Sequence, residues 1–264
     1  MNSLRVWSLR ASLSDIAAVS SSGVVLPAES RTRYFDHLTR LPVTKRTQLD
    51  SYRVEGRRVS TSDFSWSAEN AARRLSSEIL RRESRPRFFG ATLDEVIDEL
   101  RRHAESGSAS PRDLGVWLTE VGVGGRAMVA ARALERAHST HDVFERVDAP
   151  IVRAPADTYL SIPRSRWLLR GYRDGWSGTD ATRVAFRVRP GSPSRSAARG
   201  LRVDALIATL AHPGVVAPAR VVSAWPDAGL VLTLDPSLDD LTRGAKDLLR
   251  VAQRLSHQAS DQAA

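Results

Sequence analysis

The side chains best suited to catalysis lie in two separate segments of the chain. His138 and His141 are spaced to share one face of a predicted helix with the apolar Leu134. Asp174 ends the segment Gly171-Tyr-Arg-Asp, at the end of a predicted strand. A carboxylate and an imidazole can hold a divalent metal, which lowers the pKa of bound water and stabilises charge on a phosphate. Asp174 and His138 therefore have side chains of the kinds that act in metal-assisted catalysis.

A second group of residues is suited to binding phosphate rather than to cleaving it. Arg187 and Arg189 lie two residues apart on a predicted strand, so they share one of its faces. That face favours phosphate, and a fixed charge at Arg187 repels a divalent cation. Tyr172 and Trp176 flank Asp174 and are candidates for stacking on bases. The predicted nucleic-acid-binding residues are Arg173, Arg187, Arg189, Arg195, Arg199, Arg202, Tyr172 and Trp176.

Both groups fall within a segment whose hydrophobic pattern predicts an α/β region. Helical spacing covers residues 125–145, 196–210 and 238–255, and strand-like segments cover 156–162, 165–172, 182–189, 218–225 and 230–235. In chain order this is αβββαββα, which predicts a mixed central sheet flanked by helices.

The preceding part of the chain is predicted to be mainly α-helical. Ser67 is a candidate N-cap, and Thr92-Leu-Asp-Glu95 matches a capping box before an apolar helical stripe. Gly122 is a plausible stop for a short helix. The expected domains are an N-terminal region over 1–124, an α/β domain over 125–256 and a disordered tail over 257–264.

The element order and the Gly-x-x-Asp segment resemble the PD-(D/E)XK nuclease superfamily, in particular its RecB-type exonuclease branch. The resemblance covers about half the chain and implies that His138 and Asp174 bind metal. It also implies an Asp/Glu-x-Lys motif on the third strand, where Arg187-Val-Arg189 stands instead, and a Gln-x-x-x-Tyr signature that residues 199–210 lack. The resemblance therefore implies a catalytically degenerate, nuclease-like domain.

Composition supports a polyanion as the partner. The 264 residues contain no cysteine, which excludes disulfides, thiolate metal sites and a cysteine nucleophile. The net charge is +9, and residues 151–220 hold twelve arginines against four acidic residues. A concentrated excess of this kind is typical of a nucleic-acid-binding surface. Arginine enrichment also follows from a GC-rich genome, and edge-strand arginines also keep sheets soluble.

Three functions follow as hypotheses. The first is a DNA-binding or accessory component of a DNA-processing or repair assembly, with no cofactor. The second is a divergent Mg²⁺-dependent nuclease in which an acid such as Asp157 or Glu135 completes the metal site. The third is a protein-interaction module that docks on a larger protein through the apolar stripe of the last helix. Its residues are Leu241, Leu248, Val251 and Leu255.

The N-terminal segment predicts neither a signal peptide nor a membrane anchor. Its apolar stretch around residues 16–19 is too short and too often interrupted for either. We therefore expect a cytoplasmic protein without a membrane partner.

Overall fold

The computed structural model shows an α/β protein with two compact units. It describes residues 4–8, 19, 23–27, 47–49, 52–56, 66–106, 113–147, 151–152, 156–161, 167–179 and 182–261, with backbone alone for 47–49, 52–56, 151–152, 156–161, 167–170 and 251–261. The helical unit comprises Ser60–Glu145 and Arg153–Pro155, and the remainder forms the sheet unit.

Four α-helices and a 3₁₀ turn build the described part of the helical unit. They are α3 (Ala68–Arg82), η2 (Pro86–Phe88), α4 (Phe89–Glu105), α5 (Leu114–Glu120) and α6 (Gly122–Glu145). The side chain of Ser67 accepts a hydrogen bond from the Asn70 amide (3.2 Å), which confirms it as the N-cap of α3. Gly122 follows the C-cap of α5 and is the first residue of α6, and its φ of +75° is a conformation that favours glycine.

The capping box predicted at Thr92 is wrong. Helix α4 begins three residues earlier, at Phe89, because the turn started by Pro86 runs directly into it. Phe89 is fully buried in the core of the helical unit with Leu75 and Leu93. Thr92 consequently lies within the helix and is itself buried.

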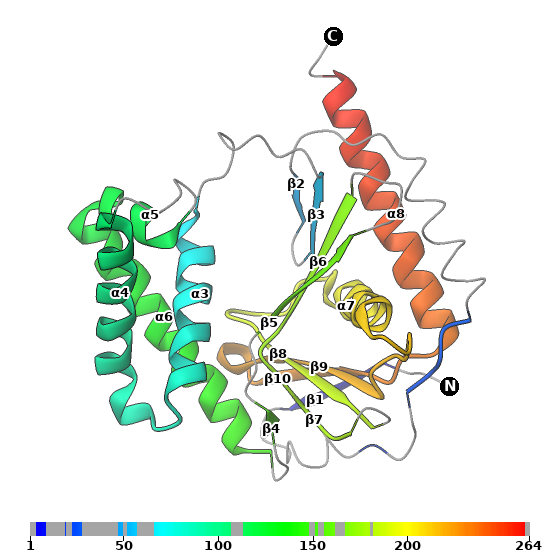
Figure 1. The fold of residues 1–264 in the computed structure, drawn as a ribbon. Coiled ribbons are helices and arrows are strands. Elements are labelled where there is room, and N and C mark those ends of the chain that lie inside the picture. Colours follow the sequence, from blue (N-terminus) through cyan, green and yellow to red (C-terminus); the bar gives the residue numbers. More distant parts are fainter. Residues whose placement is uncertain are drawn as a thin grey trace. The chain divides into compact units, whose positions relative to one another are not determined.

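Two sheets form the framework of the sheet unit (Figure 1). The six-stranded sheet has the order β1-β10-β9-β8-β7-β4, and the four-stranded sheet has the order β2-β3-β6-β5. Their bounds are β1 Leu4–Ser8, β2 Thr47–Leu49, β3 Tyr52–Gly56, β4 Ile151–Val152, β5 Ala156–Ser161, β6 Trp167–Arg173, β7 Gly175–Ser177, β8 Val184–Val188, β9 Arg220–Trp225 and β10 Leu230–Leu234. Strands β8 and β9 pair in parallel and every other pairing is antiparallel, so the larger sheet is mixed, as predicted.

One nearly continuous stretch of chain joins the two sheets. Strand β6 belongs to the smaller sheet and β7 to the larger one, and only Asp174 separates them. Helix α7 (Ala197–Ala211) lies in the angle between the sheets, with α8 (Leu238–Asp261) packed along it (Figure 1). Leu201 and Leu206 of α7 are buried with Leu234 of β10 in this core. Asp174 and α7 therefore both sit where the sheets meet.

Two predicted boundaries differ from those in the structure. Helix α6 packs on α3 and buries Val129 and Ala133 in the helical unit, so the units divide after Glu145 and not after residue 124. A hydrophobic stripe predicts that a helix packs but not on which neighbour. Helix α8 includes 257–261 of the expected disordered tail, in a segment without proline or glycine, and 262–264 lie outside the described residues.

Candidate anion-binding pocket

The surroundings of Asp174 indicate a structural role for its carboxylate. It is 1 % exposed, and its carboxylate accepts hydrogen bonds from the Val188 amide (2.7 Å) and the Tyr172 hydroxyl (2.8 Å). Its own amide donates to the carbonyl of Phe186 (2.9 Å). Through these contacts Asp174 ties the bend between β6 and β7 to β8. The side chain thus satisfies backbone and hydroxyl donors at the corner where the chain changes sheets.

Arg187 and Arg189 share one face, as predicted, but both turn toward a carboxylate. Arg187 Nη1 lies 3.2 Å from each carboxylate oxygen of Asp204 on α7, and Arg189 Nη2 lies 2.9 Å from Oδ2. All three side chains are 16 % exposed or less. Asp204 therefore compensates part of the positive charge on the face that was predicted to favour phosphate.

A pocket opens beside helix α7, where β6 continues into β7 and the paired strands β8 and β9 lie next to them. It brings together four of the predicted binding residues, two aromatic and two cationic. The strands and their connections contribute Gly171, Tyr172, Arg173, Trp176, Arg183, Ala185, Phe186, Arg187, Pro218 and Val221, and helix α7 contributes Asp204, Ile207 and Ala208. Three arginines thus face a single carboxylate, and that carboxylate also binds Arg189 outside the lining.

Arg173 is the least compensated of the pocket's cations. Within the described part of the chain it forms no ion pair, and its Nε is buried without a hydrogen-bond partner. Burial lowers the pKa of Arg173 below the ordinary arginine value, although a guanidinium remains charged at neutral pH. The Nε of Arg187 is also buried without a partner. The pocket therefore holds more positive charge and more N–H donors than its own acceptors satisfy.

His138 belongs to the helical unit, whereas Asp174 belongs to the sheet unit. The His138 ring packs on Phe89 with centroids 5.0 Å apart, and His141 Nε2 lies 3.1 Å from the Ser84 carbonyl. Glu135 also lies on α6, and the side chain of Asp157 is outside the described residues. Among the residues that the structure describes, no three His, Cys, Asp or Glu side chains are grouped to hold a metal.

The other arginines that were predicted to bind nucleic acid do not line the pocket. Arg195 and Arg199 are exposed around the start of α7, and Arg202 pairs with Asp240 of α8 (3.3 Å).

Arg220, another arginine of the basic segment, forms a two-pronged ion pair with Asp235, with Nη2 2.6 Å from Oδ2. Both acids follow residue 220, so part of the charge excess of 151–220 is neutralised by the next segment of the chain.

Sequence reasoning missed two pocket residues, Arg183 and Asp204. Arg183 donates from Nη2 to the Val216 carbonyl (3.3 Å), and Asp204 is the carboxylate that orients Arg187. One signal was readable in advance. Asp204 and Ala208 are four residues apart on α7, so a polar residue interrupts the side of a helix that faces a sheet.

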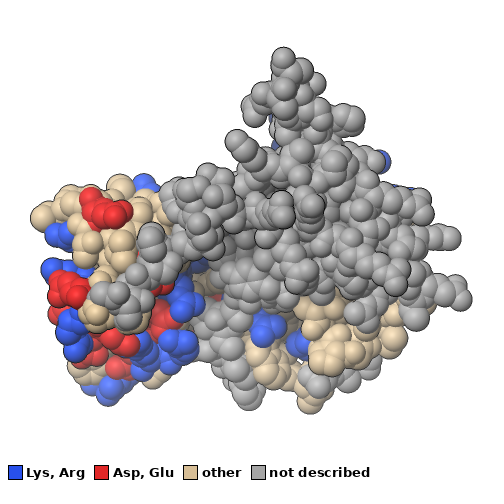
Figure 2. Space-filling model, turned by 45° about the horizontal axis from the view of Figure 1, so that its top comes forward, with Lys and Arg blue, Asp and Glu red and all other residues tan. Residues whose placement is uncertain are grey.

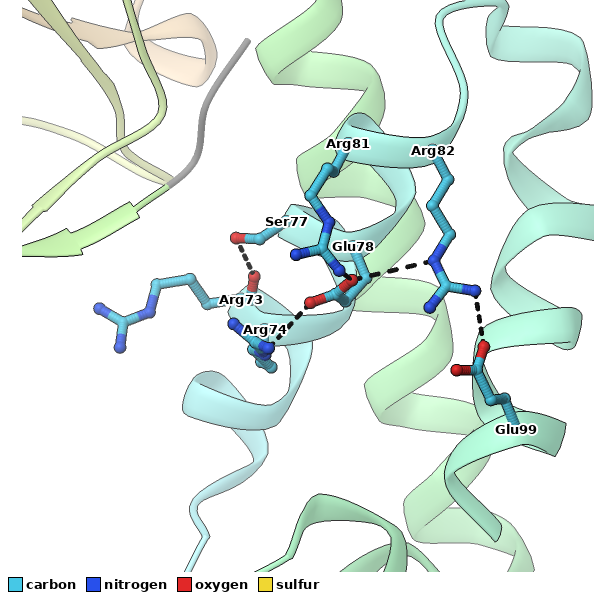
Figure 3. Close-up of polar contacts among 7 residues, drawn as sticks. All are labelled: Arg73, Arg74, Ser77, Glu78, Arg81, Arg82 and Glu99. Carbon is cyan, nitrogen blue, oxygen red and sulfur yellow. Dashed lines mark hydrogen bonds and ion pairs between the residues drawn. The ribbon is translucent and has the colours of Figure 1, made fainter. Parts of the chain in front are cut away.

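The arginines of the helical unit form a separate, internally paired cluster. Arg74, Arg81 and Arg82 converge on the carboxylate of Glu78, which is 8 % exposed, and Arg82 reaches Glu99 of α4 (2.7 Å; Figure 3). In the face drawn in Figure 2, basic and acidic side chains of this unit alternate closely. This cluster joins α3 to α4 and offers little uncompensated charge for an anion.

The ion pair between Glu83 and Arg85, in the turn after α3, leads to a pH-dependent prediction. Arg85 donates side-chain and backbone hydrogen bonds to the Glu83 carboxylate and lowers its pKa from the ordinary 4.5 to about 2. Because the folded pKa is depressed, the contact contributes fully above the ordinary pKa and is lost as the pH falls through about 2. An NMR titration should show this midpoint, and Arg85→Gln should return it toward the ordinary value. An ordinary midpoint in the unchanged protein would contradict the ion pair.

The apolar stripe proposed for docking is partly used inside the protein. Leu241 and Leu248 of α8 are 0 % and 1 % exposed and belong to the core of the sheet unit. The side chains of Val251 and Leu255 lie outside the described residues. None of the described helices combines the length and apolar character needed to span a bilayer.

Comparison of the chain with protein-family models, with curated proteins and with solved structures finds no match. The resemblance to PD-(D/E)XK nucleases therefore stays a hypothesis that rests on the residues quoted for it. Functional inference depends on the pocket and its chemistry.

Proposed function

We propose that the sheet unit binds DNA through the pocket between β6–β8 and α7, as a non-cleaving accessory component of a DNA-processing assembly. The observation that carries this proposal is the convergence of Arg173, Arg183 and Arg187 on a pocket with one carboxylate, Asp204. Guanidinium groups bind phosphate oxygens through paired, charge-assisted hydrogen bonds. The proposal includes the cytoplasmic location expected from the sequence, where DNA is accessible.

The aromatic residues of the pocket favour a nucleic acid over a simple anion. Tyr172 and Trp176 line the same pocket and are partly exposed. The Arg187 guanidinium lies 5.8 Å from the centroid of the Tyr172 ring, so the charge and the aromatic surface are adjacent. Single-stranded nucleic acids are commonly bound by this combination of cations for the backbone and rings for the bases.

Binding rather than cutting is proposed because of what Asp174 and Arg187 do. The Asp174 carboxylate accepts hydrogen bonds from the Val188 amide and the Tyr172 hydroxyl. Arg187 stands at the strand position where the resembled nuclease family carries an acid. A divalent cation beside this guanidinium would be repelled. Cleavage of DNA on addition of Mg²⁺ or Mn²⁺ would replace this proposal with the nuclease hypothesis.

Arg173→Gln is expected to weaken DNA binding about tenfold, because it removes a charge-assisted hydrogen bond to phosphate. It should also reduce the slope of log affinity against log salt by about one. Fluorescence anisotropy of a labelled single strand at about 50 and 200 mM salt measures both quantities.

Arg199→Gln is the matched control, since it removes the same charge from an exposed position outside the pocket. Its affinity should stay within about twofold of the unchanged protein. If both variants lose affinity equally, the pocket is not the binding site. If the unchanged protein binds no DNA at the lower salt, the proposed function is wrong.

A further inference from the structure

A small alanine lies between two arginines on the face of the sheet that lines the pocket. Arg183, Ala185 and Arg187 alternate along β8 and the residue before it, so they share this face. In register, Ala185 lies between Trp176 of β7 and Val221 of β9. Because the alanine side chain is a single methyl group, its larger neighbours leave a gap above it, beside helix α7.

The size of this gap fits one small anion and excludes a nucleotide. Its cavity volume is about 40 Å³, which is room for about three water molecules. Pockets that bury a drug-sized ligand have about 300–1,000 Å³. A phosphate group held by one ester bond has three free oxygens, which need about the room of three waters. An internal phosphodiester continues into the chain on both sides, so it cannot enter a gap of this size.

The charge of the lining also fits a phosphate monoester. Three arginines, Arg173, Arg183 and Arg187, and one carboxylate, Asp204, line the pocket and give a net formal charge of +2. A phosphate monoester carries about −1.5 to −2 at pH 7, whereas an internal phosphodiester carries a single negative charge. The Nε atoms of Arg173 and Arg187 are buried without a hydrogen-bond partner among the described residues. The lining therefore has both charge and N–H donors left over for phosphate oxygens.

We propose that this pocket binds the terminal phosphate of a DNA strand, so that the protein recognises phosphorylated strand ends. This inference rests on the proposed function and adds the part of the DNA that enters the pocket. Internal phosphates stay outside the gap, and the strand end supplies the group that fills the space over Ala185. Hydrolysis of a phosphodiester leaves one phosphate monoester and one hydroxyl, so such ends are products of strand cleavage.

The test compares labelled single strands that differ at their ends. Thymidine strands of about 12 nucleotides carry a 5′-phosphate, a 3′-phosphate or hydroxyls at both ends, and a hydroxyl-ended strand of about 14 nucleotides matches the charge of the phosphorylated ones. Anisotropy titrations should show a phosphorylated strand binding about tenfold more tightly than both hydroxyl-ended strands. Equal affinity for all four strands would overturn the terminal-phosphate site and leave DNA binding intact. If no strand binds, the proposed function fails together with this inference.

Inorganic phosphate alone distinguishes a strand end from a free anion as the ligand. It should displace the phosphorylated strand only at a concentration far above that of the strand, because it lacks the contacts of the attached DNA. Displacement at equal concentrations would assign the pocket to free phosphate and overturn the DNA end as its ligand.

Two pocket-filling substitutions test the location of the site without changing any charge. Ala185→Val adds two methyl groups on β8, and Ala208→Leu enlarges the side chain that α7 contributes to the pocket. Each should reduce the preference for a phosphorylated end to less than about twofold, because the gap is filled. Ala211→Leu is the matched control, since it makes the same change at an exposed position of α7 outside the pocket lining and should retain the preference. Circular dichroism identifies any variant that fails to fold, and a preference that survives in a folded pocket-filling variant would overturn the pocket as the site.

Discussion

Replacing Asp204 with alanine should lower the free energy of unfolding of the sheet unit by about 3 kcal/mol, because it leaves two buried arginines without their shared carboxylate. Arg187 and Arg189 are 12 % and 16 % exposed, so water cannot replace the lost acid fully. The change should be read as a shift in the urea midpoint with an unchanged slope. Asp204→Asn keeps the size and an acceptor oxygen and should cost less.

Asp239→Ala is the matched control for this prediction. It also removes one negative charge, but from an exposed pair with Arg243 on the surface of α8. Exposed pairs of this kind contribute about 0–1 kcal/mol, so its midpoint should barely move. Equal effects of the two substitutions would contradict the shared ion pair as a stabilising contact.

Asp204→Ala should also strengthen DNA binding where the protein remains folded. Removing the only carboxylate among the pocket-lining residues frees Arg187 for phosphate, and we expect a roughly threefold rise in affinity at low salt. Loss of affinity by a folded Asp204→Ala protein would instead mean that Asp204 positions the arginines for the ligand. The direction of the change therefore reports the role of this carboxylate.

Replacing Asp174 with alanine should be comparably destabilising, by about 3 kcal/mol. The substitution leaves the Val188 amide and the Tyr172 hydroxyl without their acceptor at the bend between the sheets. The amide is shielded from solvent, since Asp174 is 1 % exposed and Val188 is also buried. Equilibrium denaturation in urea measures the loss.

Asp174→Asn separates the structural role from a catalytic one. An asparagine oxygen can still accept from the Val188 amide, so this variant should retain most of the stability lost by Asp174→Ala. A metal-binding carboxylate would behave differently, because Mg²⁺ would raise the melting temperature of the unchanged protein and Asp174→Asn would abolish that rise. Such a result would contradict the structural role and favour the nuclease hypothesis.

Local patterns predicted several strands of the second half of the chain well, whereas β1, β2 and β3 lie in the region that was predicted to be mainly helical. The strands predicted over 156–162, 182–189 and 230–235 form as β5, β8 and β10 within one or two residues at each end. The spacing of apolar residues shows which side of a strand or helix is buried, and a few consecutive residues are enough to reveal it. The predicted helix start at Thr92 is wrong because a competing local signal precedes it. Pro86 begins a 3₁₀ turn that leads directly into α4.

The site was predicted only in part. Tyr172, Arg173, Trp176 and Arg187 gather in one pocket, because β6 continues almost directly into β7 and β7 pairs with β8. Asp204 was missed because its two partners lie fifteen and seventeen residues away in the chain, on another element. His138 and Asp174 were predicted to act together, and they belong to different units because α6 packs on α3, a helix that precedes it in the chain.

The amino-acid sequence was sufficient to establish an α/β architecture, the face shared by Arg187 and Arg189, and the excess of arginine between residues 151 and 220. Only the tertiary structure decided which of those arginines lie beside a compensating acid. Arg202 and Arg220 meet Asp240 and Asp235, whereas Arg173 meets no acid among the described residues. The net charge of a segment counts only residues that are neighbours in sequence, whereas ligand binding depends on residues that are neighbours in space. Folding brings acids from later elements to some of the arginines and not to others.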